Sequence, residues 1–326
     1  MLRVAILGAG GIAIKMAKTL RGMETAEAYA IAARDLGRAE AFAKEYGFTK
    51  AYGSYAEMLQ DENVDLVYIA VPHTHHYMCA KMCLEAGKHV LCEKPFCVNV
   101  DQTKELLAMA EDKKLLLTEA IWTRYMPSRK IIDDLIAGGE IGEVTSLTAN
   151  LGYELSEIPR IWDPKLAGGA LMDVGIYLVH FARMVFGEKK AKITSEALFK
   201  NGVDMIDSII MTFEDGQVAT MQSNVYAVQN RNGSIFGTKG YIEITNINNP
   251  EVIKVFDENY QEVKSIVVPK QITGYEYEVE ACARAIAAKE IECEEIPHAE
   301  TIRVMEIMDE IRNSWGYELP LSLIHI

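Results

Sequence analysis

Three side chains in this sequence, a lysine, an aspartate and a tyrosine, are candidates for acid–base chemistry. The lysine is Lys94, in the run Cys92-Glu93-Lys94-Pro95, which directly follows a short apolar segment. Lysine is normally a solvated surface charge, but at the carboxyl edge of a parallel sheet it would lie where open α/β folds bind ligands. On these four residues alone, a charged turn is the simpler interpretation.

Asp173 and Tyr177 stand four residues apart in an apolar segment, Gly168–His180, that we expect to be helical. Residues four apart share a helix face, so this face carries an acid and a phenol. Buried polar groups need hydrogen-bond partners, and a ligand pocket is one way to supply them. An equally good alternative is that Asp173 only caps the helix and Tyr177 is a core aromatic residue with a solvated hydroxyl group.

A glycine-rich turn near the amino terminus predicts a dinucleotide-binding site. The segment Gly8-Ala9-Gly10-Gly11-Ile12-Ala13 separates an apolar strand from a helical run. Gly8 permits the tight turn, Gly10 lets a pyrophosphate approach the backbone and the helix amino end, and Ala13 allows close packing of helix and strand. The position between strand and helix favours dinucleotide binding over a plain glycine turn.

The end of the second expected strand, at about Ala33, bears on which nicotinamide cofactor binds. A carboxylate there would accept a hydrogen bond from the ribose 2′-hydroxyl of NAD, whereas an arginine suits the 2′-phosphate of NADP. We favour NADP with Arg34 as the phosphate partner. NAD is the alternative if the strand ends later and Asp35 serves as the acid. Arg38 is a candidate for the same site, although a solvated helix residue is the simpler interpretation.

The loop Pro72-His73-Thr74-His75-His76 follows the next expected central strand and concentrates three histidines. No cluster of carboxylates accompanies them, and adjacent residues on a turn rarely converge on one metal ion. We therefore expect no metal. Pro72 and His73 are interpreted as loop groups beside the nicotinamide, and capping of the following helix, Tyr77–Ala86, is the alternative.

The alternation of strands and helices changes near residue 121. Strands alternate with helices over the first 120 residues, with Ser54 and Asn99 as expected helix caps, which predicts a doubly wound parallel sheet. Later strands lack helices between them and predict an open, mainly antiparallel sheet. We expect an α/β protein with a Rossmann domain at residues 1–121 and a substrate-binding and dimerisation α+β domain at residues 122–326. The expected strands of this second domain are Glu143–Tyr153, Ile193–Phe199, Met205–Phe213, Val218–Val225, Ser234–Phe236, Tyr241–Ile244 and Val263–Val268.

Composition limits the partners of this 326-residue chain. Its net charge of −14 argues against nucleic acid or an anionic membrane, because either needs a basic field. No apolar window approaches the length of a membrane span, and the first apolar run is too short for a signal peptide. Six cysteines on expected helices and strands indicate reduced thiols in a cytoplasmic protein. The apolar tail at residues 321–326 is unusual for a chain end; packing on a partner and an artefactual extension are both open.

Taken together, five stretches resemble the glucose–fructose oxidoreductase / inositol dehydrogenase / MocA (Gfo/Idh/MocA) family along nearly the full chain. The resemblance implies a Rossmann domain, an open-faced antiparallel domain, a pyridine nucleotide cofactor and often a homodimer or higher homo-oligomer. The stretches are Ala32-Ala33-Arg34-Asp35-Leu36, Ala86-Gly87-Lys88-His89-Val90-Leu91-Cys92-Glu93-Lys94-Pro95, Glu119-Ala120-Ile121-Trp122-Thr123-Arg124, Gly168-Gly169-Ala170-Leu171-Met172-Asp173-Val174-Gly175-Ile176-Tyr177 and Gly237-Thr238-Lys239-Gly240.

The same resemblance implies roles for individual residues. It places the Glu93-Lys94-Pro95 motif near the nicotinamide and the reacting hydroxyl group, and it places Asp173 and Tyr177 on a pocket helix. Many family members have histidine where Tyr177 stands, and the dihydrodiol dehydrogenase branch has tyrosine. Further cofactor or pocket contacts are implied for Trp122, Arg124, Arg160 and Trp162.

We therefore expect an oxidoreductase that transfers a hydride between NADP and a secondary alcohol of a sugar, polyol or dihydrodiol. Tyr177 would act as acid or base on the alcohol oxygen. An unperturbed tyrosine pKa of ~10 is too high for a base at neutral pH, so Lys94 would stabilise the phenolate. Asp173 would bind a substrate hydroxyl group or orient Lys94. The alternatives are a non-catalytic nucleotide-sensing regulator and an NAD-dependent glycosidase.

Overall fold

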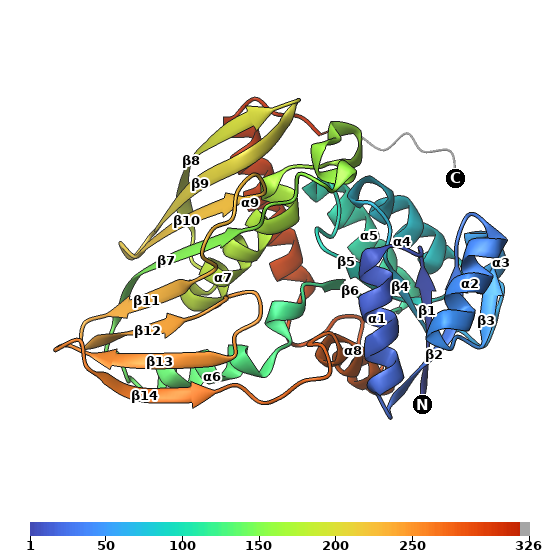
Figure 1. The fold of residues 1–326 in the computed structure, drawn as a ribbon, viewed down its shortest axis with the longest axis horizontal. Helices are drawn as coiled ribbons and strands as arrows, with labels where there is room; N and C mark the ends of the chain where they lie inside the picture. Colours follow the sequence, from blue (N-terminus) through green and yellow to red (C-terminus); the bar gives the residue numbers. More distant parts are fainter. Residues whose placement is uncertain (320–326) are drawn as a thin grey trace. The chain divides into compact units, whose positions relative to one another are not determined.

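The computed structural model describes residues 1–319 of the chain, and the apolar tail at 321–326 lies outside the described residues. The described chain forms two compact units (Figure 1). The first contains residues 1–125 and 271–305, and the second contains residues 126–270 and 306–319. The second unit therefore interrupts the first in sequence. This differs from two successive domains at 1–121 and 122–326, because residues 271–305 return to the first unit.

The first unit is built on a six-stranded sheet in the order β3-β2-β1-β4-β5-β6, with every neighbouring pair parallel. The doubly wound parallel sheet predicted from the sequence is confirmed. The strand order reverses between β1 and β4, and the carboxyl ends of the strands at such a point form the ligand-binding crevice of open α/β folds. The strands are β1 Leu2–Leu7, β2 Ala26–Ala32, β3 Lys50–Tyr52, β4 Leu66–Ile69, β5 His89–Glu93 and β6 Leu117–Ala120.

Two helices of the first unit begin at the capping residues that the sequence predicts for them. The side chain of Ser54 accepts from the N–H of Glu57 at 3.1 Å, and that of Asn99 accepts from Gln102 at 2.9 Å, as predicted. The returning segment adds a helix and pairs with the sheet edge, since the N–H of Leu117 donates to the carbonyl of Ile291 at 3.0 Å. The helices are α1 Gly11–Gly22, α2 Leu36–Tyr46, α3 Tyr55–Leu59, α4 His76–Glu85, α5 Val100–Lys113 and α8 Glu276–Ala288; α9 His298–Ser314 begins here and ends in the second unit.

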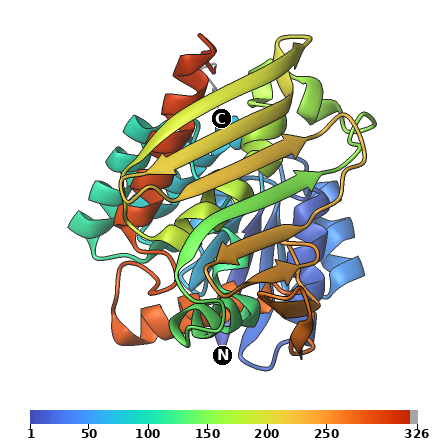
Figure 2. The same cartoon turned by 90° about the vertical axis from the view of Figure 1, so that its left-hand side faces the viewer.

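The second unit is built on an eight-stranded sheet in the order β14-β13-β12-β11-β7-β10-β9-β8. All neighbouring pairs are antiparallel except β7 and β10, so the mainly antiparallel prediction is confirmed. The prediction missed β13. Figure 2 shows the broad outer face of this sheet toward the viewer. The strands are β7 Val144–Gly152, β8 Ala191–Lys200, β9 Val203–Phe213, β10 Val218–Asn224, β11 Gly233–Gly237, β12 Gly240–Ile244, β13 Val252–Asp257 and β14 Glu262–Val267.

Two helices accompany this sheet, α6 Pro127–Ala137 and α7 Ile176–Phe186. A π-helical turn, Leu171–Gly175, leads into α7. The helical segment Pro164–Phe186 is long and apolar enough to cross a membrane, contrary to our reading that no apolar window approaches that length. Because 89% of that window is buried inside the fold, it is the core helix of this unit.

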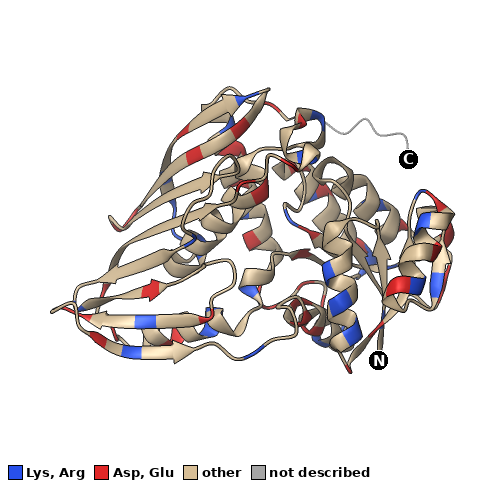
Figure 3. Ribbon diagram, viewed as in Figure 1, with Lys and Arg blue, Asp and Glu red and all other residues tan. Residues whose placement is uncertain are grey.

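Charged residues are interspersed along both units. In Figure 3, Lys and Arg alternate with Asp and Glu on helices and strands alike. On α1, three basic residues, Lys15, Lys18 and Arg21, follow the glycine-rich turn, and the first turn of this helix carries no acid. The start of α1 is therefore free of local negative charge from its own residues.

Candidate functional site

The glycine-rich turn has the shape that a pyrophosphate requires. Gly8 adopts φ +103°, and a Cβ atom there would lie 2.5 Å from the carbonyl oxygen of Ala70, so only glycine fits. At Gly10 and Gly11, by contrast, an added Cβ would meet nothing within 4 Å. Gly10 is the N-cap of α1 and no side chain caps it. The backbone N–H groups at the start of α1 are therefore open to an anionic ligand, and buried Ala13 permits the close packing beneath them.

Just after β2, Asp35 caps the next helix, and Arg34 and Arg38 are exposed. The strand ends at Ala32, and the side chain of Asp35 accepts from the N–H of Arg38 at 2.8 Å, which caps α2. Arg38 donates from Nη2 to the carbonyl of Ala9 at 2.6 Å, so it contacts the glycine-rich turn. Arg34 is exposed and interacts electrostatically with Tyr55 and His75. Asp35 is thus engaged in capping, which favours Arg34 over Asp35 as the ribose-side residue.

His76 connects the histidine loop to the Lys94-Pro95 corner. Its Nδ1 lies 2.8 Å from the carbonyl oxygen of Pro95, and its Nε2 lies 3.0 Å from that of Val71. Burial lowers the pKa of His76 to about 4, so the ring is neutral at pH 7. His76 therefore holds the end of β4 against the corner that carries Lys94. His73, also buried, lies in a 3₁₀ turn just before it.

Glu93 fixes the backbone from which Lys94 projects. Its Oε1 accepts a hydrogen bond from the hydroxyl of Tyr68, and its Oε2 accepts from the N–H of Lys94 at 3.1 Å. Glu93 is buried, whereas Lys94 is partly exposed at the carboxyl end of β5. The peptide bond between Lys94 and Pro95 is cis. Lys94 thus lies at the sheet edge predicted for it, and the Glu93 carboxylate fixes its backbone.

Two buried acids near this corner were missed in the sequence. Glu119 on β6 accepts from the N–H of Phe96 at 2.9 Å, and burial raises its pKa to about 7, an effect opposed by Arg124, His76 and Lys94. Glu278 on α8 is fully buried, and within residues 1–319 neither carboxyl oxygen has a hydrogen-bond partner. Burial, with Glu93 nearby, raises the pKa of Glu278 well above its usual range. For Glu119, an acid inside the apolar run at residues 115–121 was the available signal, whereas Glu278 stands in an acidic stretch that gives none.

The returning segment packs against Trp122 and Arg124. The rings of Trp122 and Tyr275 stack with centroids 4.5 Å apart and planes 12° apart. A Cβ at Gly274 would lie 2.6 Å from the Trp122 ring, so this approach requires glycine. Arg124 forms an ion pair with Glu300 at 2.5 Å. The positions of both predicted contact residues are therefore set by residues 271–305.

In the second unit, Asp173 is buried and paired with Arg160. Nη2 of Arg160 lies 2.9 Å from Oδ1 of Asp173, whose side chain is 7% exposed. Tyr177 lies four residues on and is also buried. Asp173 lies inside the π-helical turn, a rare conformation that recurs at functional sites. The cap of this helix is another residue, Asp204, whose Oδ2 accepts from the N–H of Leu171 at 2.6 Å. Asp173 is therefore not the helix cap.

Trp162 stands in the 3₁₀ turn Pro159–Trp162, two residues after Arg160. Its ring meets the Tyr226 ring edge-on, with centroids 6.2 Å apart and planes 82° apart. Its Nε1 is buried without a hydrogen-bond partner among the described residues. Trp162 and Arg160 therefore come from one short turn.

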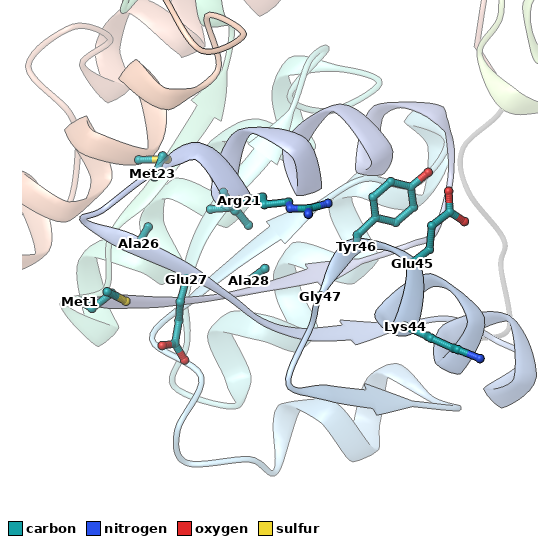
Figure 4. Close-up of a pocket in the computed structure, with 11 residues that line it drawn as sticks. Met1, Arg21, Met23, Ala26, Glu27, Ala28, Lys44, Glu45, Tyr46 and Gly47 are labelled. Carbon is teal, nitrogen blue, oxygen red and sulfur yellow. The ribbon is translucent and has the colours of Figure 1, made fainter.

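A hollow of about 450 Å³ lies elsewhere in the first unit (Figure 4). It is lined by residues at the amino ends of β1 and β2 and the carboxyl ends of α1 and α2, including Met1, Arg21 and Tyr46. This is the sheet edge opposite to the glycine-rich turn. None of the predicted site residues lines it, so we do not assign the chemistry to it. Throughout residues 1–319, no group of three or more His, Cys, Asp or Glu side chains is arranged to hold a metal ion.

Comparison with known families matches both halves of the chain. Residues 2–121 match the family model described as oxidoreductase family, NAD-binding Rossmann fold, and residues 130–243 match the GFO/IDH/MocA C-terminal domain. The mouse protein named trans-1,2-dihydrobenzene-1,2-diol dehydrogenase is 34% identical over 333 residues, covering 98% of each chain. The Xenopus tropicalis protein of the same name is 35% identical over 298 residues, covering 89% of this chain and 90% of that protein.

Solved structures share the fold at lower identity. A 3-ketoreductase from Actinomadura kijaniata in complex with NADP and TDP-benzene aligns with a TM-score of 0.88 at 24% identity, covering 96% of this chain and 97% of that one. A levoglucosan dehydrogenase in complex with NADH and levoglucosan aligns with a TM-score of 0.86 at 20% identity, covering 98% and 100%. These similarities show a common architecture for the whole chain.

Proposed function

This chain is an oxidoreductase of the GFO/IDH/MocA family, and from that premise we propose that it transfers a hydride between NADP and a secondary alcohol of a sugar, polyol or dihydrodiol. The curated relatives that it matches along nearly its full length are named dihydrodiol dehydrogenases, which supports a vicinal diol as the first substrate to try. The observation that carries the proposal is the open, uncapped glycine-rich turn with Arg38 hydrogen-bonded to it.

In this proposal the first unit holds the cofactor. Gly8, Gly10, Gly11 and Ala13 form the turn for the pyrophosphate. Arg34 binds the 2′-phosphate, because Asp35 is engaged as the cap of α2. When bound, the cofactor supplies a nicotinamide carbon that accepts or releases a hydride. Further contacts that we assign to cofactor binding are Arg38, Pro72, His73, Glu93, Lys94, Trp122 and Arg124 of this unit, and Trp162 of the second unit.

The second unit supplies the proton-transfer group. Tyr177 takes the proton from the alcohol oxygen during oxidation and returns it during reduction. Lys94 stabilises the phenolate and the oxygen of the substrate by its positive charge. Asp173, whose charge is neutralised by Arg160 at 2.9 Å, accepts a hydrogen bond from a neighbouring substrate hydroxyl group. A vicinal diol presents two such oxygens, one for Tyr177 and one for Asp173.

The test is turnover measured by NADPH absorbance. Purified protein is mixed with NADP or NAD and with a panel of aldoses, polyols and trans-dihydrodiols. We expect NADPH formation with at least one class and a kcat/KM for NADP about tenfold or more above that for NAD. Binding of NADP without turnover of any substrate would instead support a nucleotide-sensing regulator. Release of sugar from a glycoside without net NADPH would support a glycosidase.

We also propose that the protein is a cytoplasmic homodimer that associates through the open face of the second sheet (Figure 2). Apolar side chains on its outer strands are exposed, among them Leu198, Ile210 and Val263. All six cysteines are free and buried, which suits a reducing compartment. Sedimentation equilibrium of the wild type and of Ile210→Glu tests the interface, because a charge on a buried dimer face would yield monomers.

A further inference from the structure

The helix that carries Asp173 and Tyr177 starts on a buried carboxylate from strand β9. Oδ2 of Asp204 accepts from the N–H of Leu171 at 2.6 Å, and the N–H of Ala170 also hydrogen-bonds to this carboxylate. The helical segment has no cap of its own. Asp204 is 1% exposed, so its negative charge acts on the helix amino end with little screening by water.

The chain makes room for Asp204 with a glycine. Gly169 adopts φ +107°, and any Cβ there would overlap Oδ1 of Asp204. A residue other than glycine would therefore displace the carboxylate from the helix start. Gly169 is therefore required by the close approach of β9, whereas a Cβ at Gly168 would overlap the carbonyl oxygen of Ile161.

A second buried acid, Asp207, is hydrogen-bonded to Asp204. Its Oδ2 accepts from the hydroxyl of Ser223 at 2.7 Å, and its Oδ1 meets no donor among the described residues. Carboxylates only accept hydrogen bonds, so two hydrogen-bonded carboxyl groups must share a proton. Oδ1 of Asp207 is the oxygen that lacks a donor and can itself donate.

The surroundings place this proton on Asp207 and the charge on Asp204. Burial raises the pKa of Asp204, but the backbone N–H groups that it accepts oppose this rise and favour an ionised carboxylate. It also interacts electrostatically with Arg312 and Tyr317, both from the chain after α9 begins, and Arg312 is 5% exposed. Among residues 1–319, Asp207 receives one hydroxyl group, and no cation acts on it. Burial, with Asp204 as the second cause, raises the pKa of Asp207 well above its usual range.

We propose that Asp207 is protonated at neutral pH and donates a hydrogen bond to Asp204, and that this pair is a positioning device for the helix bearing Asp173 and Tyr177. The inference deepens the proposed function and rests on it only for its catalytic consequence. Neither acid touches substrate or cofactor in this scheme. They affect proton transfer only by orienting the start of the helix that carries Asp173 and Tyr177.

Two asparagine variants separate the roles of the pair. Asp207→Asn reproduces the protonated acid, because its amide donates to Asp204 while its carbonyl accepts from Ser223. Asp204→Asn removes the charge that faces the helix start and Arg312, and it turns an amide donor toward the donating Asp207. Asp215→Asn, an exposed acid of the same unit, is the matched control.

We expect Asp207→Asn and the control to keep kcat within about threefold of wild type, whereas Asp204→Asn lowers kcat by about tenfold or more. The NADP dissociation constant should stay unchanged in all three, since the glycine-rich turn belongs to the other unit. The infrared carbonyl band of protonated carboxyl groups at neutral pH should lose intensity in Asp207→Asn and keep it in the control.

The opposite pattern of kcat, with Asp207→Asn the impaired variant, would overturn the proposal, and so would equal losses in both. An unchanged infrared band in Asp207→Asn would also overturn it. If Asp204→Asn does not fold, the infrared comparison of wild type with Asp207→Asn decides by itself. If the wild type turns over no substrate, the proposed function fails, while the infrared comparison still tests the proton assignment.

Discussion

Nη2 of Arg38 lies 2.6 Å from the carbonyl oxygen of Ala9, so a side chain of α2 holds the glycine-rich turn that precedes α1. The same helix is capped by Asp35, which receives the N–H of Arg38 itself. Asp35 and Arg38 therefore have structural roles, and Arg34, just before them in the chain, is exposed. Substitutions of Arg34 and of Arg38 should therefore affect cofactor binding differently.

Replacing Arg34 by alanine should weaken NADP much more than NAD. We expect a KM for NADP raised by about tenfold or more and a KM for NAD changed less than about twofold, because only NADP carries the 2′-phosphate. Arg38→Ala should weaken both cofactors alike, since it loosens the turn that both use. Steady-state kinetics with each cofactor measures this. Equal losses for NADP and NAD in Arg34→Ala would reject the assignment.

The glycines of the turn should respond differently to an added methyl group. Gly10→Ala meets no neighbour within 4 Å, so the free protein should keep its melting temperature while the NADP dissociation constant rises about tenfold or more. Gly8→Ala meets the carbonyl of Ala70 at 2.5 Å in a positive-φ conformation and should destabilise the fold itself. Thermal unfolding with and without NADP distinguishes the two. A stable Gly10→Ala variant with normal affinity would exclude the turn from pyrophosphate binding.

The Tyr177→Phe variant should lose most of its turnover and still bind NADP. We expect kcat to fall by about 100-fold or more, because the variant lacks the proton-transfer group. NADP affinity should be unchanged, since the residue lies in the second unit. Tyr226→Phe, at a tyrosine of the same unit that meets Trp162, is the control and should stay near wild type. Near-normal turnover in Tyr177→Phe would remove this residue from the mechanism.

Glu119 should make stability depend on pH. Its pKa is about 7 in the folded protein, against an ordinary value near 4.5, so the folded protein retains a proton that the unfolded chain releases between these values. The free energy of unfolding contributed by Glu119 therefore falls as pH rises from about 4.5 to about 7 and is constant above that, a change on the order of 3 kcal/mol.

Glu119→Gln keeps a carbonyl for the N–H of Phe96 and cannot ionise, so it should remove this dependence. Urea unfolding of wild type and variant across this pH range gives the difference directly. Glu258→Gln, at an exposed position, is the control. If the free energies of unfolding of wild type and Glu119→Gln change with pH in parallel, Glu119 has the same pKa in the folded protein as in the unfolded chain, and the prediction is wrong.

Local patterns in the sequence predicted those parts of the fold that depend on near neighbours. The parallel sheet, the glycine-rich turn between β1 and α1, and the caps at Ser54 and Asn99 all follow from short-range spacing and appear in the structure. Asp173 and Tyr177 were also found as a pair on one buried helix. The ion pair between Asp173 and Arg160 was not predicted, because the family resemblance implied Arg160 only as a separate pocket contact.

Other features depend on residues far apart in the sequence. Asp204 alternates with the buried Val203 and Met205 and so looks like a solvent-facing position of the strand, and only the close approach of Gly169 reveals that it is buried. Strand β13 has no simple alternation and is defined by its partners β12 and β14. The return of residues 271–305 to the first unit leaves no local signal, because the contacts that define it span more than a hundred residues.

That return limits how the protein can be divided or recombined. A fragment ended after residue 121 would lack the carbonyl of Ile291 that pairs with Leu117 and the His298 side chain 2.8 Å from the Leu117 carbonyl, leaving an edge of β6 bare. A fragment extended to residue 125 would contain Trp122 but would still lack Tyr275, which stacks on its ring. The second unit is thus inserted into the sequence of the first, and transplanting it onto another nucleotide-binding domain requires splice points on both of its flanks.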